Sequence, residues 1–375
     1  MRQGNVMIAG RALQSALYRH RYYAKQALGL ANRVLPRRTG RWLRGLAEQV
    51  AFRVVPQYQG DTLPPIFHYW SGRYVAPLLA RIGIGRPEDL FFIETERHAR
   101  KTGRPISVVS LGTGSCSLEV SLAAALRERG IQATLECVDI NASLIQQATT
   151  NARALGLTDC MSFKVADCTH YARPAPADVI IVNQFLHHVE DLEAFCASLA
   201  HMLAPDGLLL TADMVGRNGH LPWPAVDSVV QSHWKALSPA QQFDRFYNAR
   251  RTHYAAVDHA SYSNEGVRAQ DIVHCLSNSF DFTTFLTFGG AIMPFVERRV
   301  GFNFDPQDAA DRTFIDEVAE RDQTALLNAE YPGSNMIAVL RHKGCAQPGV
   351  FHPVTPAEHI RMTADQLSLA AKRLS

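Results

Sequence analysis

Residues 106–119 read Ile-Ser-Val-Val-Ser-Leu-Gly-Thr-Gly-Ser-Cys-Ser-Leu-Glu, and they predict three elements in a row. The first half is a continuous apolar run rich in β-branched residues, which is typical of a strand buried on both faces of a parallel sheet. Gly112 and Gly114 then allow a tight turn and a close approach of a ligand to the backbone. Apolar residues at helical spacing follow, with Ser117 as the expected N-cap. A strand, a glycine-rich turn and a helix predict the opening of a nucleotide-binding α/β unit.

This stretch resembles the first motif of the class I S-adenosylmethionine-dependent methyltransferases, which is acidic-x-Gly-x-Gly-x-Gly. The resemblance implies that the turn of Gly112 and Gly114 wraps the methionine part of the cofactor. The chain departs from the motif at two positions, since Ser110 stands in place of the acid and Cys116 in place of the third glycine. We expect Glu119, in the first turn of the helix, to supply the missing negative charge near the cofactor's ammonium group.

The alternation of strands and helices continues beyond this motif. Apolar runs predict strands at 134–139, 161–167, 178–183, 207–213, 280–288 and 335–340, and helices are expected over 142–155 and 192–203. This rhythm predicts an α/β fold with a doubly wound, mainly parallel sheet. The resemblance, which covers residues 105–213 and 279–342, implies a Rossmann-like sheet of seven strands whose last strand enters antiparallel.

The changes of character along the chain predict six segments. They are a basic helical N-terminal extension (1–60), a helical lid (61–104), a cofactor-binding α/β core (105–215), a mostly helical cap that forms the acceptor pocket (216–278), the closing strands with a helical insertion (279–345) and a tail with a helix (346–375).

Polar residues end three of the predicted strands, where ligands of an open α/β sheet bind. Asp139 is expected to accept both ribose hydroxyls of the cofactor, with Ile140 beside it. The resemblance implies that Asp167 accepts the adenine amino group, and we expect Cys168 to line the adenine slot. Asn183 ends the fourth strand and completes the predicted cofactor site. Ribose recognition by an acid also suits an NAD(P)-dependent oxidoreductase, which is the rival interpretation.

The segment after the fourth strand separates these two interpretations. Residues 183–191, Asn-Gln-Phe-Leu-His-His-Val-Glu-Asp, and residues 203–209 resemble the corresponding segments of small-molecule methyltransferases. A general base is expected among His187, His188 and His253, with His187 first. The alternative is that one ring only bonds the backbone and caps the helix. We predict no metal, because Met214 follows Asp213 where a metal-assisted enzyme would place a further oxygen ligand.

Aromatic residues are the candidates for acceptor binding. Tyr69, Trp70 and Tyr74 lie upstream of the glycine turn, and Trp234 and Tyr247 lie in the predicted cap. Their rings suit an apolar or ring-bearing small molecule rather than nucleic acid. The alternative is that these rings pack the core of a helix or of the cap.

The first 53 residues contain 11 basic residues and a single acid, a net charge of +10 in a chain whose total is +3. Three roles of this segment stay open: contact with an anionic membrane surface or an acidic partner, removal as a transit peptide, and packing on its own domain. A homodimer also stays open. Seven scattered cysteines without a Cys-x-x-Cys pair indicate reduced thiols and a cytoplasmic protein.

Taken together, these patterns predict methyl transfer from S-adenosylmethionine to a small organic acceptor, O-methylation first and N- or C-methylation next. The remaining alternative is a non-catalytic binding protein with the same fold.

Overall fold

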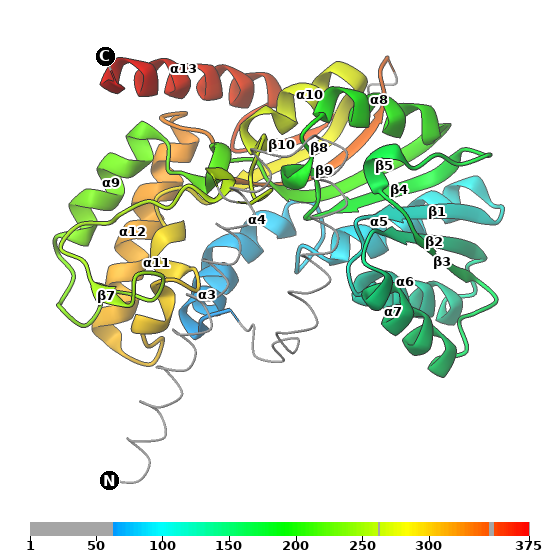
Figure 1. Cartoon of the computed structure of the whole chain (residues 1–375), viewed down its shortest axis with the longest axis horizontal. Coiled ribbons are helices and arrows are strands. Elements are labelled where there is room, and N and C mark those ends of the chain that lie inside the picture. Colours follow the sequence, from blue (N-terminus) through cyan, green and yellow to red (C-terminus); the bar gives the residue numbers. More distant parts are fainter. Residues whose placement is uncertain (1–62, 262, 345–348, 375) are drawn as a thin grey trace, which may run out of the picture.

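The computed structural model describes residues 63–261, 263–344 and 349–374, so the predicted basic N-terminal extension lies outside the described residues. A single eight-stranded sheet runs through the molecule in the order β10-β8-β9-β5-β4-β1-β2-β3 (Figure 1). The strands are β1 (Ile106–Leu111), β2 (Ala133–Asp139), β3 (Met161–Val165), β4 (Ala177–Asn183), β5 (Leu203–Met214), β8 (Phe280–Phe288), β9 (Asn335–His342) and β10 (Val350–His352). Within this sheet β9 pairs antiparallel with β5 and β8, and every other pairing is parallel, so the predicted antiparallel last strand of the core is confirmed.

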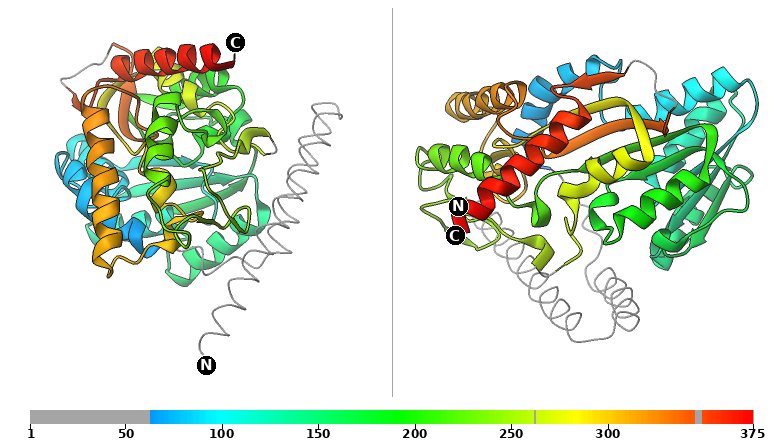
Figure 2. Two further views of the ribbon diagram at one scale, coloured as in Figure 1. Left: turned by 90° about the vertical axis from the view of Figure 1, so that its left-hand side faces the viewer. Right: turned by 90° about the horizontal axis from the view of Figure 1, so that it is seen from above.

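Helices cover both faces of the sheet, which confirms the predicted doubly wound fold (Figure 1). One face carries α5 (Asp89–Thr102), α6 (Ser117–Glu128) and α7 (Ala142–Ala154), and the other carries α8 (Leu192–Met202) and α10 (Ile272–Ser279). The last helix, α13 (Pro356–Leu374), contacts α10 and α9 (Pro224–Trp234), and from above it runs across this end of the molecule (Figure 2). No helix among the described residues is long and apolar enough to cross a membrane.

A further group of helices packs beside the β8–β10 end of the sheet. It begins with α3 (Pro65–Trp70), which continues through the π-helical turn η1 (Ser71–Val75) into α4 (Ala76–Ala80). The later members are α11 (Met293–Val296) and α12 (Ala309–Leu327), and α3 contacts both of them. The segment predicted as a lid therefore contains α3, η1, α4 and α5, with turns over residues 81–88, and its first helix packs against α11 and α12.

Two predictions about the fold need correction. The sheet has eight strands rather than seven, because the short strand β10 pairs with the edge of β8. The region 216–278 is irregular for much of its length, with a two-stranded hairpin of β6 (Phe243–Asp244) and β7 (Ala249–Arg250) after α9. It also contains the short 3₁₀ turns η4 (Asn218–His220), η5 (His259–Ser261) and η6 (Ala269–Asp271). Its last helix, α10, belongs to the core, where it packs with α8 on the sheet.

Candidate functional site

The glycine turn between β1 and α6 has backbone angles that favour glycine. Gly112 has φ +73°, and a Cβ atom added there would lie 2.3 Å from the ring of Phe185. Gly114 has φ +54°, and a Cβ there would meet nothing within 4 Å. Cys116, where the motif has its third glycine, also takes the left-handed conformation and is the N-cap of α6, so the predicted Ser117 cap is one residue off. The turn keeps the glycine geometry of the motif with a cysteine in it.

Asp139 joins the glycine turn to the end of β2. Its Oδ2 accepts a hydrogen bond from the Gly114 amide at 2.7 Å, and its Oδ1 accepts one from the Asn141 amide at 2.8 Å. Each carboxylate oxygen has a second acceptor site. Ile140 follows with 45% of its surface exposed. The structure therefore brings the predicted ribose acceptor to the glycine turn, and its role toward a cofactor stays a prediction.

Ser110 and Glu119 form a buried pair beneath this turn. The Ser110 hydroxyl donates a 2.7 Å hydrogen bond to Glu119, and both residues are 3% exposed. The Glu119 carboxyl group thus reaches the end of β1, where the motif has its acid, from the neighbouring helix. Burial raises the pKa of Glu119, although the hydrogen bond from Ser110 works in the opposite direction. Its expected contact with an ammonium group stays a prediction.

The residues after β3 are held by local hydrogen bonds. Asp167 accepts from the Thr169 amide at 3.0 Å and the Thr169 hydroxyl at 2.7 Å, and its other oxygen faces His170. Burial alone would raise the pKa of Asp167, but these partners lower it overall. The Cys168 sulfur lies under the glycine turn, where it accepts a hydrogen bond from the Gly112 amide at 3.2 Å. Burial raises the pKa of the Cys168 thiol to about 12. Only 4% of Cys168 is exposed.

A buried carboxylate organises the turn after β4, where Asn183 ends the strand. Asp213, on β5, is 1% exposed and accepts four hydrogen bonds. The donors are the amides of Phe185 (2.9 Å), Leu186 (2.7 Å) and Met214 (2.8 Å) and the His187 ring, whose Nδ1 lies 2.6 Å away. These bonds fix the orientation of the His187 imidazole and leave its Nε2 pointing to other partners.

The Nε2 atom of His187 faces a second acid. Glu265 places its Oε2 3.6 Å from His187 Nε2 and 3.7 Å from His220 Nε2. Burial lowers the pKa of His187, but Asp213 and Glu265 outweigh it and raise that pKa to about 9. Sequence reasoning missed Glu265 because it lies in an irregular loop without periodicity, and it considered Asp213 only as a metal ligand.

His188 is oriented by the backbone rather than by an acid. Its Nδ1 lies 3.2 Å from the carbonyl oxygen of Asn264, and burial together with the charge of His187 lowers its pKa. His187, His188 and Glu265 place one donor atom each within 4.8 Å of one another, a set that a divalent metal ion could use. The expectation that no metal binds here therefore stays a prediction.

A cavity of about 160 Å³ opens off the end of β5, next to this cluster. Both polar and apolar groups line it, among them Met214, His220, Trp223, Tyr254, His259 and Glu297. His220 has φ +56°, an uncommon angle for a non-glycine residue. None of the three predicted bases, His187, His188 and His253, is among the residues that line this cavity. His253 is exposed on a loop, whereas His187 and His188 lie in the neighbouring cluster.

The predicted aromatic residues are mostly engaged elsewhere. The Tyr69 and Tyr74 hydroxyls each donate a 2.9 Å hydrogen bond to Asp316 of α12, and Trp70 is 3% exposed. Trp234 is fully buried, and its indole nitrogen donates to a backbone carbonyl oxygen. These contacts pack the helices together, and a role of these four rings in acceptor binding stays a prediction.

Tyr247 differs because 38% of its surface is exposed. Its ring lies 4.6 Å from the guanidinium carbon of Arg251 and 5.3 Å from that of Arg299. A role of Tyr247 in acceptor binding stays a prediction.

Comparisons with known proteins bear on this edge of the sheet, where the glycine turn, Asp139 and the His187–Asp213 pair meet. Residues 104–285 match the family model described as "Methyltransferase domain". Residues 104–285 therefore form a class I methyltransferase domain. The matched region contains all of the predicted cofactor residues and all of the predicted bases.

Two curated relatives and several solved structures are similar to this methyltransferase. The citrinin polyketide synthases of Monascus ruber and Monascus purpureus are each 22% identical over 201 residues, and the match covers 51% of this chain but 7% of theirs. The solved methyltransferase (CMeT) domain of a citrinin polyketide synthase is 24% identical over 31% of either chain, with a TM-score of 0.28. An O-methyltransferase from a polyketide synthase multienzyme of Brevibacillus brevis, solved with S-adenosyl-L-homocysteine, is 11% identical over 84% of this chain and 87% of that one, with a TM-score of 0.41.

Proposed function

We propose that this methyltransferase transfers the methyl group of S-adenosylmethionine to a small organic acceptor, with a hydroxyl oxygen as the favoured site and nitrogen or carbon as the alternatives. The observation that carries the proposal is the buried His187–Asp213 pair, joined at 2.6 Å at the carboxyl ends of β4 and β5. This pair presents an oriented imidazole on the edge of the sheet that also carries the glycine turn.

The residues present fit the cofactor. The open space at Gly114 allows a ligand to approach the backbone of the turn, and Asp139 has acceptor sites for two ribose hydroxyls. When bound, the cofactor would supply an electrophilic methyl group on a sulfonium. The protein's own contribution is to position the acceptor in line with that methyl group and to remove a proton from it.

His187 is suited to remove that proton. The Nδ1 atom is held by Asp213, so Nε2 is the atom that exchanges a proton with the acceptor or with Glu265. Because these two acids raise the pKa of His187 to about 9, the fraction of neutral imidazole grows as the pH rises toward that value. The cavity off the end of β5 is the proposed place of the acceptor. The relatedness to polyketide synthases supports an organic, partly apolar acceptor.

The test is a transfer assay with isotopically labelled S-adenosylmethionine and a panel of phenols, aliphatic alcohols and amines. With an accepted substrate, His187→Gln should lower turnover by about 10²–10⁴, the usual contribution of a general base. The affinity for S-adenosylhomocysteine should barely change, because Asp139 and the glycine turn carry that binding. His253→Gln is the matched control and should keep wild-type turnover. Wild-type turnover by a folded His187→Gln variant would contradict the assignment.

A further inference from the structure

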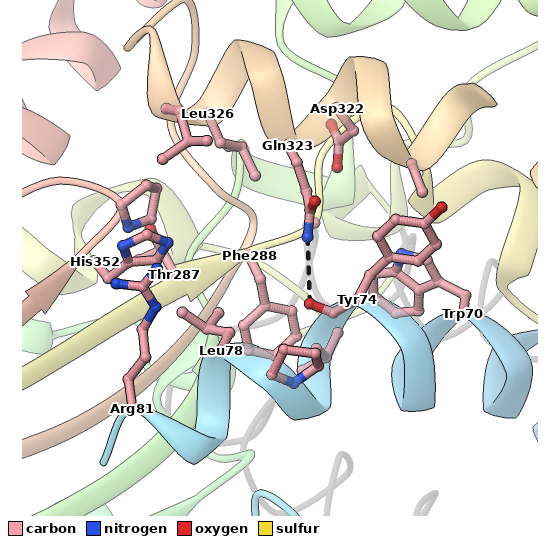
Figure 3. Close-up of a pocket in the computed structure, with 16 residues that line it drawn as sticks. Trp70, Tyr74, Leu78, Arg81, Thr287, Phe288, Asp322, Gln323, Leu326 and His352 are labelled. Atoms are coloured by element: carbon pink, nitrogen blue, oxygen red, sulfur yellow. Dashed lines mark hydrogen bonds between the residues drawn. The ribbon is translucent and has the colours of Figure 1, made fainter. Parts of the chain in front are cut away.

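A second cavity, of about 230 Å³, lies between the first helical stretch and α12, off the carboxyl end of β8 (Figure 3). It shares no lining residue with the cavity beside His220. One wall is a single face of the helix that runs from α3 through η1 to α4, with Trp70, Tyr74 and Leu78 at four-residue spacing. Phe288 of β8 and Leu326 of α12 form much of the opposite side. The body of the cavity is therefore apolar and aromatic.

The two ends of this cavity differ in character. Arg81 and His352 lie together at one end, and Trp70 and Tyr74 lie at the other (Figure 3). Arg81 is exposed, and neither Arg81 nor His352 has an acidic side chain within ion-pair distance among the described residues. Burial and the nearby charge of Arg81 lower the pKa of His352. The cavity thus ends in an unpaired guanidinium beside a neutral imidazole.

A buried hydroxyl group adds independent evidence for a ligand. Thr287 lines the cavity and is 1% exposed, yet its Oγ1 has no hydrogen-bond partner within the described structure. Leaving a buried polar atom without a partner costs about 1–3 kcal/mol, and a polar group of a bound ligand would relieve that cost. The adjoining π-helical turn, Ser71–Val75, is of a kind that occurs frequently at functional sites.

Asp322, the carboxylate in the wall of this cavity, already has hydrogen-bond partners and does not pair with Arg81. Asp322 is 2% exposed, and it accepts from the Tyr331 hydroxyl at 2.7 Å and from the Ala291 amide at 2.6 Å. Gln323 donates to the Tyr74 carbonyl oxygen at 3.3 Å (Figure 3). The cationic group that remains for a ligand is Arg81, whose planar fork matches a carboxylate.

We propose that this cavity binds a small amphipathic carboxylic acid, with its carboxylate on Arg81 and its apolar body between Leu78, Phe288 and Leu326. A cavity of this size excludes a dinucleotide or a whole S-adenosyl compound and suits a short aryl or acyl chain. The site goes beyond methyl transfer, because it shares no residue with the glycine turn or with the His187–Asp213 pair.

The experiment is calorimetric titration of the full chain with 3-phenylpropionate and with 3-phenylpropanamide, its uncharged isostere, without cofactor or acceptor. The acid should bind at least tenfold more tightly than the amide. Arg81→Gln should lower the affinity for the acid at least tenfold and leave the affinity for the amide unchanged. Because Arg81 is exposed, this variant should fold. Arg100→Gln, an exposed arginine on α5 that pairs with Glu96, is the matched control and should bind like the wild type.

A second variant reports on the location of the ligand. Leu327 lines the cavity and is 59% exposed, so the Leu327→Asp variant should fold. The new negative charge in the wall should lower the affinity for the acid at least tenfold. Equal affinities for acid and amide, no binding of the acid, or wild-type binding by the Arg81→Gln or Leu327→Asp variant would each overturn the proposal.

Discussion

Asp213 shows how a single carboxylate can set the geometry of the site. Transferring an ion into the protein interior is costly unless hydrogen bonds replace its hydration. Four donors surround Asp213, three of them backbone amides, and the fourth is the His187 ring. The imidazole is therefore held by a group that is itself held rigidly by two strands. An oriented base of this kind loses little freedom when an acceptor binds.

Gly112 and Gly114 allow a comparison of two roles of glycine within one turn. Gly112→Ala should lower the free energy of unfolding by about 2–4 kcal/mol, because the left-handed backbone is strained and the added Cβ overlaps the Phe185 ring. Gly114→Ala meets open space and should cost only the backbone strain, about 1 kcal/mol. Urea denaturation of both variants measures the difference. Equal losses would show that Phe185 moves aside at little cost.

Asp139 and Glu265 show what the residues alone could predict. Asp139 follows an apolar strand directly and precedes a helix, so its place at the carboxyl edge of the sheet follows from the pattern. Glu265 reaches His187 from a loop 78 positions later in the chain, across a contact that no local pattern encodes. The same holds for Phe185 against Gly112. Long-range contacts of this kind depend on how loops pack, which sequence periodicity does not specify.

The turn η3 (Leu186–His188) links β4 to β5 through the His187–Asp213 pair. The free energy of unfolding of the protein should therefore depend on pH. The pKa of His187 is raised from 6.5 to about 9, which means that the folded chain binds this proton more tightly than the unfolded chain. The stabilisation is complete below pH 6.5 and is lost as the pH rises through about 9. Over that range the free energy of unfolding should fall by up to about 3 kcal/mol.

The measurement is urea denaturation between pH 6 and 10 for the wild type and for His187→Gln. The variant lacks the titrating ring, so the difference between the two free energies of unfolding should shrink as the pH rises. A difference that stays constant across this range would show that the Asp213 and Glu265 carboxylates do not raise the affinity of His187 for its proton.

Elements with strong periodicity were predicted well, and short ones were not. Continuous apolar runs identified β1 and β4, which are buried on both faces, and β8 was predicted with its observed bounds. The three-residue strand β10 and the two-residue strands of the β6–β7 hairpin are too short to show a period. Residues 216–278 were predicted to be mostly helical, but much of this region is irregular between α9 and α10.

Charge is distributed unevenly along the chain. Residues 1–53 carry a net charge of +10, and the rest of the chain carries −7. We propose that the basic segment attaches the enzyme to anionic surfaces. Replacing Arg33, Arg37, Arg38 and Arg41 by Gln in the full chain should weaken sedimentation with phosphatidylserine vesicles at least tenfold, since each basic residue near such a surface contributes about 1 kcal/mol.

The matched control replaces four exposed arginines of the described part of the chain, Arg86, Arg97, Arg100 and Arg361, by Gln. The control should sediment with vesicles like the wild type, and binding by the wild type should weaken as salt is added. Equal losses in both sets would show that total charge rather than the N-terminal segment determines attachment.

We claim that the glycine turn and Asp139 form a site for S-adenosylmethionine, which calorimetric titration with S-adenosylhomocysteine can test. The wild type should bind this product, and Asp139→Ala should weaken binding by about 1–3 kcal/mol, or roughly tenfold to a hundredfold, because two ribose hydroxyls lose their acceptor. NADH, titrated in parallel, should not bind. Binding of NADH without binding of S-adenosylhomocysteine would contradict the claim.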